Sequence, residues 1–265
     1  MKFTFSILII FLLTVGCTEN LVTGRKQLSL VSESELQAMA IPEYQAFLSQ
    51  NKVLNNKDAE MVQRVGSRIA AAIKSFYDKK GQPSVLDGYS WEFKLVENAE
   101  VNAWCMPGGK VVVYTGLLPI AKNETGLAIV LGHEITHAIA QHGSERMSQG
   151  LLQQLGGNAL SFALANKPSE TQNLFMTAYG VGSTVGALLP FSRKEETEAD
   201  EYGLYFAAMA GYNPQEAIPF WERMAAAGGS KQVEFLSSHP SDASRIAKMK
   251  QFMPQALKYY KNGKT

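Results

Sequence analysis

The hydrophobic positions between residues 58 and 83 predict an amphipathic helix. After Asp58, apolar side chains recur every three or four residues as far as Phe76, which is the spacing of one helical face. The apolar positions are Val62, Val65, Ile69, Ala72, Ile73 and Phe76. Gly81 and Pro83 interrupt the pattern, so we expect the helix to end before them.

The hydrophobic spacing changes to every second residue between residues 89 and 95, which predicts a strand with one face in water. Residues 101–106 and 110–115 look like two further strands, and Pro107-Gly108-Gly109 lies between them as a turn. Together these segments predict a small sheet ahead of the next helix.

A second apolar stripe, from Leu127 to Ile139, predicts the helix that follows this sheet, and Asn123 can cap its start. Farther along, residues 151–189 are rich in Ala, Gly, Leu and Ser, and residues 171–190 carry no charged side chain. This segment resembles a membrane span, but its glycines and serines dilute the hydrophobicity. We therefore favour a pair of helices that is buried or lines a cleft.

The first residues differ from the rest of the chain and resemble a bacterial export signal. Lys2 precedes an apolar run over residues 3–13 that is too short to cross a membrane as a stable helix. The run ends in Val-Gly-Cys17, which is similar to a lipobox, whose cysteine becomes the lipidated first residue. We expect a signal peptide over residues 1–16 and a lipidated polar tether over residues 17–31. A secreted chain without lipid and an uncleaved anchor are the alternatives.

Composition changes this picture little. The 265 residues are 46% hydrophobic, which is enough to bury a sizeable core, and no linker or repeat divides residues 32–265, which we expect to form one domain. The formal net charge of +1 provides no basic surface for nucleic acid. A lipid on Cys17 would leave Cys105 without an intramolecular partner, so we expect no disulfide.

The second predicted helix contains the HExxH motif, His133-Glu134-Ile135-Thr136-His137. Residues four apart project from one helical face, so His133 and His137 can bind a single Zn²⁺ ion between them. Glu134 is then placed to take a proton from a metal-bound water. Two core histidines satisfied by their neighbours are the alternative, but this spacing with a glutamate between the histidines favours the metal.

A catalytic zinc site needs a third protein ligand and one open position for water. The third histidine of the metzincin pattern is absent, because His142 lies five residues past His137 and off the required spacing. We expect His142 to lie at a helix C-terminus, where it suits the exposed carbonyl groups. The third ligand should therefore be a carboxylate from elsewhere in the chain.

The candidate carboxylates follow Ser192, which forms a capping box with Glu195 and predicts a helix start at this point. Glu196 and Asp200 lie four apart on one face of that helix, while Glu198 points away from them. One of the pair could bind the metal, and the other could accept the second ring N–H of a ligating histidine. A solvated acidic helix start explains the same residues equally well.

The HExxH motif followed about sixty residues later by Ser-Arg-x-x-Glu-x-x-Ala-Asp resembles metallopeptidase family 48. Its gluzincins include CAAX prenyl proteases, HtpX-like proteases and soluble, often lipid-anchored periplasmic proteases. The resemblance implies an α+β, mostly helical zincin (gluzincin) fold, with the small mixed sheet ahead of the HExxH helix. It also implies His133, His137 and Glu196 as ligands of one Zn²⁺ per chain, Glu134 as the catalytic base and Asp200 as a carboxylate behind a ligand.

The segment from Asn102 to Gly109 resembles the edge strand of the same family, with Trp104 in place of the usual phenylalanine. We expect Asn102, Ala103, Trp104 and Cys105 to lie beside the metal and to pair with an extended substrate backbone. We interpret Cys105 as a packed thiol, because no Ser or Cys of the chain lies in a recognisable nucleophile motif.

Residues 238–246 resemble a His-Pro…Arg-Ile segment found in one branch of the family. In that branch the histidine can occupy the open position of the metal and keep the enzyme inactive. His239 is therefore a candidate switch ligand, with an oxyanion donor and a plain loop residue as alternatives. Arg245 is a candidate oxyanion donor or a structural partner of a carboxylate.

These observations predict a zinc metalloendopeptidase with a catalytic domain over residues 32–265. Its expected substrates are misfolded or unassembled cell-envelope proteins, bound in extended form. The expected location is the bacterial cell envelope, with the protein lipid-anchored at the outer membrane and facing the periplasm; the oligomeric state is left open. A lipid-anchored chaperone-like factor that uses the same cleft with little proteolysis is the alternative, and a zinc-dependent esterase or deacylase is less favoured.

Overall fold

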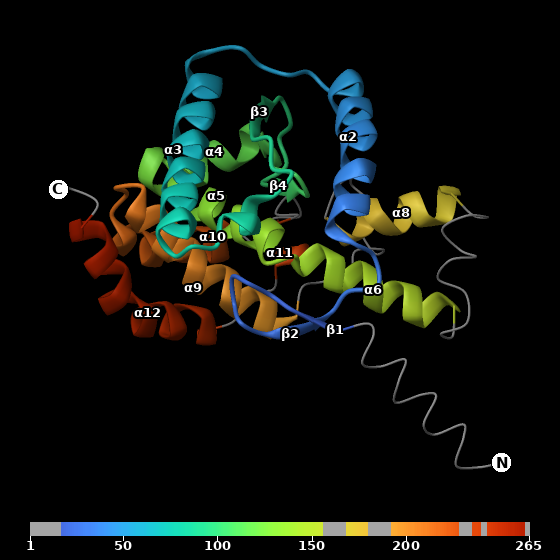
Figure 1. The fold of residues 1–265 in the computed structure, drawn as a ribbon. Helices are drawn as coiled ribbons and strands as arrows, with labels where there is room; N and C mark the ends of the chain where they lie inside the picture. Colours follow the sequence, from blue (N-terminus) through green and yellow to red (C-terminus); the bar gives the residue numbers. More distant parts are fainter. Residues whose placement is uncertain (1–16, 156–167, 180–191, 228–234, 240–242, 263–265) are drawn as a thin grey trace.

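The computed structural model describes residues 17–155, 168–179, 192–227, 235–239 and 243–262 (Figure 1). The predicted signal peptide lies outside these residues. The strands are β1 (Cys17–Glu19), β2 (Lys26–Leu28), β3 (Glu92–Val96), β4 (Ala103–Met106) and β5 (Lys110–Tyr114). The longer helices are α2 (Glu33–Gln50), α3 (Lys57–Lys79), α5 (Glu124–Ile139), α6 (His142–Leu155), α8 (Pro168–Ala178), α9 (Arg193–Met209), α10 (Ala217–Ala227) and α12 (Ala243–Asn262).

The short helical elements are η1 (Pro83–Leu86), η2 (Thr115–Leu117), α4 (Leu118–Ala121), η3 (Pro214–Glu216) and α11 (Phe235–Ser238). Helices surround the small β3–β5–β4 sheet, and the β1–β2 hairpin lies beside α9 and α6 (Figure 1). The predicted α+β, mostly helical class is therefore confirmed.

The mixed sheet lies ahead of the HExxH helix, as predicted. Its strand order is β3-β5-β4, with β3 parallel and β4 antiparallel to β5. The first strand begins at Glu92 rather than at residue 89, because its partner β5 begins at Lys110 and the register pairs these two residues. Gly108 and Gly109 adopt φ values of 77° and 84° in the β4–β5 turn, a left-handed conformation that favours glycine.

The predicted amphipathic helix is α3, which runs three residues farther than its apolar stripe. Asn56 caps its start by accepting a hydrogen bond from the Ala59 N–H. The stripe residues Val62, Val65, Ile69 and Ile73 are fully buried in the larger core cluster. This face packs against α5, α9 and β3, so α3 supports the central helix from one side.

Helix α5 carries the HExxH motif and is buried from Gly126 to Ile139. It crosses α9 where two glycines meet. A Cβ atom added to Gly132 would lie 2.5 Å from the Gly203 carbonyl oxygen, and one added to Gly203 would lie 2.7 Å from the His133 nitrogen. The absence of side chains at this crossing lets the two backbones approach closely, which brings the start of α9 to the histidines of α5.

The expected tether over residues 17–31 contains an ordered hairpin instead. β1 pairs antiparallel with β2, and Cys17 lies opposite Leu28. The Asn20 side chain donates a 2.8 Å hydrogen bond to the Ala140 carbonyl oxygen, just past the end of α5. The polar composition of this segment suggested that its side chains are solvated, but several of them form hydrogen bonds with the rest of the domain. The Cys17 side chain is exposed and free, and its lipidation stays a prediction.

The segment from residue 151 to residue 190 is described only in part, because residues 156–167 and 180–191 lie outside the described ranges. Its described portions, in α6 and α8, contact each other. Leu151, Leu174 and Phe175 are buried in a second core cluster with residues of α2 and the sheet. Among the described residues, the structure contains no helix with the length and apolarity needed to cross a membrane.

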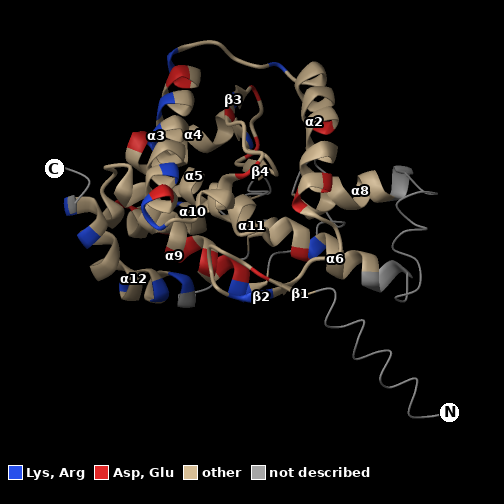
Figure 2. Cartoon of the chain, viewed as in Figure 1, with Lys and Arg blue, Asp and Glu red and all other residues tan. Residues whose placement is uncertain are grey.

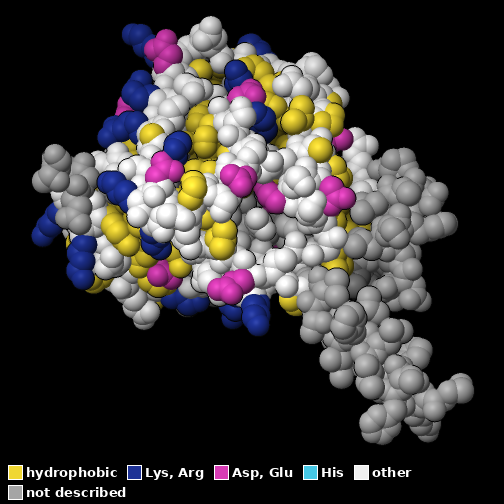
Figure 3. All heavy atoms as spheres, viewed as in Figure 1, with side chains coloured by type: hydrophobic (Ala, Val, Ile, Leu, Met, Phe, Trp, Pro, Cys, Tyr) yellow, Lys and Arg dark blue, Asp and Glu magenta, His cyan; other side chains and the backbone are white. Residues whose placement is uncertain are grey.

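All four histidines of the chain are buried, and none appears on the face shown in Figure 3. That face carries charged and hydrophobic side chains interspersed. Near the hairpin, charges of one sign gather together, because acidic residues of α9 lie next to β2 (Figure 2). The chemistry of the histidines is therefore confined to the interior.

Candidate metal centre

The two histidines of the HExxH motif lie on one face of α5. Asn123 starts this helix, and its side chain accepts hydrogen bonds from the Thr125 and Gly126 N–H groups. The Nε2 atoms of His133 and His137 lie 3.1 Å apart, and both side chains are almost completely buried. The two rings therefore present their Nε2 atoms to a common point.

A carboxylate reaches the same point from α9. Ser192 and Glu195 form the predicted capping box, in which the Glu195 side chain accepts a 2.7 Å hydrogen bond from the Ser192 N–H. Glu196 follows in the first turn. Its Oε1 atom lies 3.3 Å from His137 Nε2, and its Oε2 atom lies 3.6 Å from His133 Nε2.

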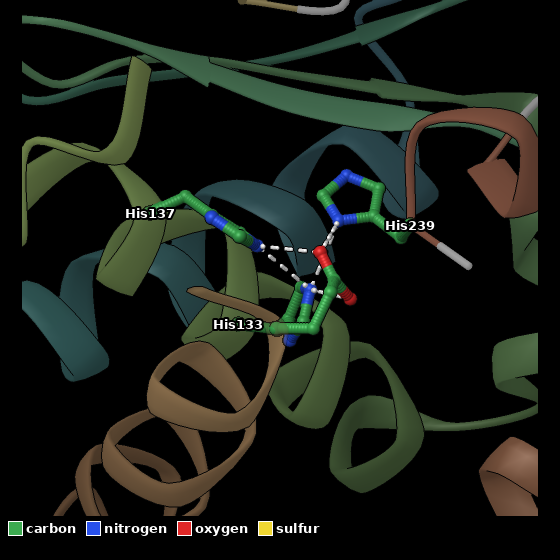
Figure 4. A group of neighbouring side chains, drawn as sticks. His133, His137 and His239 are labelled. Atoms are coloured by element: carbon green, nitrogen blue, oxygen red, sulfur yellow. Dashed lines mark hydrogen bonds and ion pairs between the residues drawn. The ribbon is translucent and has the colours of Figure 1, made fainter. Parts of the chain in front are cut away.

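His239, directly after α11, is the fourth member of the group. Its Nδ1 atom lies 2.8 Å from Glu196 Oε1 and 3.2 Å from His133 Nε2. The ring stacks on Phe235 with a centroid distance of 4.3 Å. Figure 4 shows His133, His137 and His239 converging from two separate segments. One ligand atom from each of the three histidines and from Glu196 lies within 4.8 Å of the others.

The chemistry of these donors fits zinc, which prefers imidazole nitrogens and carboxylate oxygens in a tetrahedral arrangement. Burial lowers the pKa of His133 and of His137 well below the ordinary value, so both imidazoles are neutral and keep a lone pair for a metal. Burial alone would raise the pKa of Glu196, but its imidazole and guanidinium neighbours hold it well below the ordinary value. An ionised carboxylate and neutral imidazoles are the forms that bind metal.

Glu134 lies beside this group. Its Oε1 atom is 3.5 Å from His239 Nε2, and it accepts no hydrogen bond from the residues that the structure describes. Burial, followed by the negative charge of Glu196, raises the pKa of Glu134 well above the ordinary value. Among titratable groups at functional sites, such a shift is typical of proton-transfer residues.

A second carboxylate of α9, Asp200, supports His133 from behind. Its Oδ1 atom lies 3.0 Å from His133 Nδ1, the ring nitrogen that faces away from the ligand group. Arg245 holds the carboxylate with two hydrogen bonds of 2.7 Å, and the guanidinium lies 3.4 Å above the Trp221 ring. Burial raises the pKa of Asp200 to about 7, although Arg245 acts to lower it. Glu196 and Asp200 are thus buried, not parts of a solvated helix start.

Sequence reasoning missed the corresponding partners of His137, which are His142 and Glu198. His142 Nδ1 lies 2.9 Å from His137 Nδ1, and His142 Nε2 lies 3.0 Å from Glu198 Oε2. We expected His142 to face helix carbonyls and Glu198 to point away. Instead, the chain turns at Gln141 with a φ of 55°, and the new helix α6 begins at His142. This turn brings the His142 ring back to the motif.

The predicted substrate strand forms one wall of the small pocket beside Glu134. Ala103, Trp104 and Cys105 line this pocket together with His137, Gly143, Tyr179, Ser238 and His239. The Trp104 ring packs edge-on against Phe47 at 5.0 Å on the α2 side of the sheet. Asn102 is buried, and its side chain accepts a hydrogen bond from the Ala103 N–H. Burial raises the pKa of Cys105 well above its ordinary value, as expected of a packed thiol.

Two histidines from an HExxH helix and a glutamate from a second helix define a metallopeptidase site of the gluzincin type. A comparison with protein families agrees with this geometry, because residues 56–253 match "Peptidase family M48". The chain therefore belongs to peptidase family M48, whose members use zinc.

Relatives in fungi and bacteria are similar to more than half of this chain. Mitochondrial metalloendopeptidase OMA1 of Saccharomyces cerevisiae is 36% identical over 194 residues, which cover 70% of this chain and 54% of that protein. The protein of the same name in Schizosaccharomyces pombe is 38% identical over 175 residues, or 65% and 50%. The beta-barrel assembly-enhancing protease of Escherichia coli is 30% identical over 164 residues, or 59% and 33%. The chain spans about half the length, or less, of these relatives.

The predicted location at a bacterial outer membrane is wrong on this comparison. Metalloendopeptidases named mitochondrial, from yeasts, a plant and mammals, match the chain at 31–38% identity. The prediction relied on an apolar run and a three-residue pattern ending at Cys17. Such a short pattern carries far less information about location than similarity over the whole domain.

Proposed function

We propose that this protein is a zinc-dependent endopeptidase that hydrolyses peptide bonds in polypeptides bound in extended form. One observation carries the proposal: His133 Nε2, His137 Nε2 and a Glu196 oxygen converge in a buried group, with Glu134 beside it. This is a set of zinc ligands with an adjacent proton acceptor. The family membership supports the same activity.

In this proposal His133, His137 and Glu196 hold the zinc ion. When bound, zinc lowers the pKa of a water towards neutrality and polarises the carbonyl group of the substrate. Glu134 takes the proton of the attacking water and gives it to the leaving amine. Its raised pKa suits both transfers, because a less acidic carboxyl group accepts the proton of the water more readily and can then pass it on. No covalent acyl-enzyme is needed.

The position of His239 supports a role as a switch ligand. Its Nδ1 atom lies within the ligand group, in contact distance of Glu196 and His133. A catalytic zinc needs an open position for water and substrate, so His239 has to withdraw before the reaction. We propose that His239 is a reversible ligand. Its other ring nitrogen, Nε2, lies next to Glu134.

The substrate is proposed to pair with β4. This strand lies at an edge of the described three-stranded sheet and forms a wall of the pocket beside Glu134. Main-chain pairing accepts many sequences, since it uses backbone groups that every residue has. All four residues of β4 are buried in the structure, so pairing requires the segments over the strand to separate first.

The test compares wild type with three variants for zinc content and cleavage of an unfolded protein such as casein. Glu134→Gln should retain zinc and lose at least about 100-fold in kcat, since general base catalysis contributes roughly that much. Glu124→Gln, on the exposed start of the same helix, is the control and should cleave normally. His239→Ala should raise the rate of cleavage if His239 is a reversible ligand that blocks the site.

Full cleavage by Glu134→Gln would refute the proposed chemistry. The alternative, a chaperone-like factor that holds proteins in the same cleft, makes a different prediction. In that case both wild type and Glu134→Gln suppress aggregation of an unfolded protein, and neither cleaves it at a measurable rate. Metal content is measured in every sample, so that a variant without zinc is not mistaken for one without a base.

A further inference from the structure

Arg25, on the loop of the N-terminal hairpin, lies between two carboxylates of the domain. Its Nε atom donates a 2.8 Å hydrogen bond to Glu198 Oε1, on α9. Its terminal nitrogens donate to both oxygens of Glu145, on α6, at 2.9 and 2.5 Å. All three side chains are only 12–14% exposed, so this is a mostly desolvated network, stronger than a surface ion pair.

This network continues without a break to a proposed metal ligand. Glu198 uses its other oxygen, Oε2, at 3.0 Å from His142 Nε2, while His142 Nδ1 lies 2.9 Å from His137 Nδ1. The opposite nitrogen of that ring, His137 Nε2, belongs to the ligand group. Arg25 is therefore connected to the metal centre through one carboxylate and one imidazole.

When His137 binds zinc through Nε2, the donor and the acceptor of each hydrogen bond in this series are fixed. The Nδ1 atom of His137 then carries the proton and donates it to Nδ1 of His142. That ring must carry its own proton on Nε2, which donates to the Glu198 carboxylate. Glu198 accepts in turn from Arg25. The arginine thus completes a series in which every donor has an acceptor.

The other motif histidine has a shorter version of the same arrangement. His133 Nδ1 faces Asp200, and Arg245 holds Asp200 with a pair of hydrogen bonds. In both cases an arginine fixes a carboxylate that orients a ligating imidazole. The two arginines differ in their position along the chain. Arg245 lies within residues 56–253, the part that matches the family, whereas Arg25 precedes it.

We propose that Arg25 is a positioning residue for the metal site: through Glu198 and His142, the N-terminal hairpin orients His137 and increases the affinity for zinc. The inference depends on the zinc site proposed above. Without Arg25, Glu198 loses a permanently charged partner and can rotate away from His142. His142 could then reorient, and His137 Nδ1 would lose a fixed acceptor.

The experiment measures zinc affinity by competition with a chromogenic chelator, and the visible absorption of the Co²⁺-substituted protein as a report on ligand geometry. Arg25→Ala should lower zinc affinity about tenfold and change the Co²⁺ spectrum, since lost outer partners of ligating histidines cost roughly 10–100-fold. Arg25→Lys keeps a cation near Glu198 and should recover part of the affinity. Arg64→Ala, which breaks an exposed ion pair with Glu124, is the matched control and should change neither measurement.

A double-variant cycle tests whether Arg25 acts through Glu198. Glu198→Gln alone should also weaken zinc binding, and the double variant Arg25→Ala/Glu198→Gln should be no weaker than the poorer single variant. Independent effects, in which the two fold-losses multiply, would overturn the proposal. So would Arg25→Ala with lowered stability of the zinc-free protein but normal zinc affinity and Co²⁺ spectrum, because the arginine would then only anchor the hairpin.

Two further points keep the result interpretable. If Arg25→Ala does not fold, Arg25→Lys and Glu198→Gln still give the affinity comparison, and normal affinity in both would count against the proposal. The proposed endopeptidase fails by a separate result, namely undiminished cleavage by Glu134→Gln. Neither zinc affinity nor the Co²⁺ spectrum depends on that outcome.

Discussion

Replacing Gly203 by alanine would add a methyl group where α9 crosses α5. The new Cβ atom would lie 2.7 Å from the His133 nitrogen and 2.8 Å from the Gly132 carbonyl carbon. Both neighbours are backbone atoms in the buried part of α5, so neither can rotate aside. Contacts closer than 3.4 Å are already tight, and the helices would have to separate by roughly 0.7 Å.

This separation has a cost in stability and a cost in metal binding. Overpacking a buried position costs about 1–3 kcal/mol, partly offset by the higher helix propensity of alanine, which contributes about 0.5–1 kcal/mol. For a protein of this size, about 1–2 kcal/mol corresponds to a fall in Tm of roughly 2–8 °C. Glu196 lies two turns from Gly203 on α9, and zinc sites tolerate errors of only about 0.2 Å in ligand distance. Zinc affinity should therefore fall as well.

Thermal unfolding with and without zinc measures both effects. Gly150→Ala is the control, because its Cβ atom would meet the end of the flexible Leu174 side chain, which can move. This variant should unfold within about 2 °C of wild type, as expected for a substitution that causes no strain. If Gly203→Ala unfolded at the wild-type temperature and bound zinc normally, the close α5–α9 crossing would not control the position of Glu196.

Two other predictions concern buried carboxylates. Asp200→Asn should lower zinc affinity about tenfold, because His133 loses a charged acceptor and Arg245 loses its partner; chelator competition that gave wild-type affinity would contradict this. The second concerns Glu33, whose pKa is raised by burial from 4.5 to about 7. Because the folded protein holds this proton more tightly than the unfolded chain, Glu33 lowers stability progressively as pH rises from about 4.5 through 7. Glu33→Gln should remove this decline, about 2–3 kcal/mol at about 1.4 kcal/mol per pKa unit, in urea unfolding at pH 5 and 8; equal pH dependence in the two proteins would contradict it.

The sequence by itself determined the features that depend on local spacing. His133 and His137 lie four positions apart, as do Glu196 and Asp200, so a helix places each pair on one face wherever the helix lies. The capping box of Ser192 likewise involves groups within one turn, and the structure contains it. The period of hydrophobic residues predicted α3, and the alternation predicted β3. The segments on either side of the Pro107-Gly108-Gly109 turn predicted β4 and β5, and the predicted ends differ by a few residues.

Only the tertiary structure decided which distant groups meet. The parallel pairing of β3 with β5 and the approach of α9 to α5 at Gly132 and Gly203 depend on packing across the whole core. The pairing of Arg25 with Glu198 joins residues 173 positions apart, and no periodic pattern links them. Whether a polar side chain is solvated or buried depends on the partner that folding brings to it. Composition therefore suggested a tether where the fold has a hairpin hydrogen-bonded to Glu145 of α6 and Glu198 of α9.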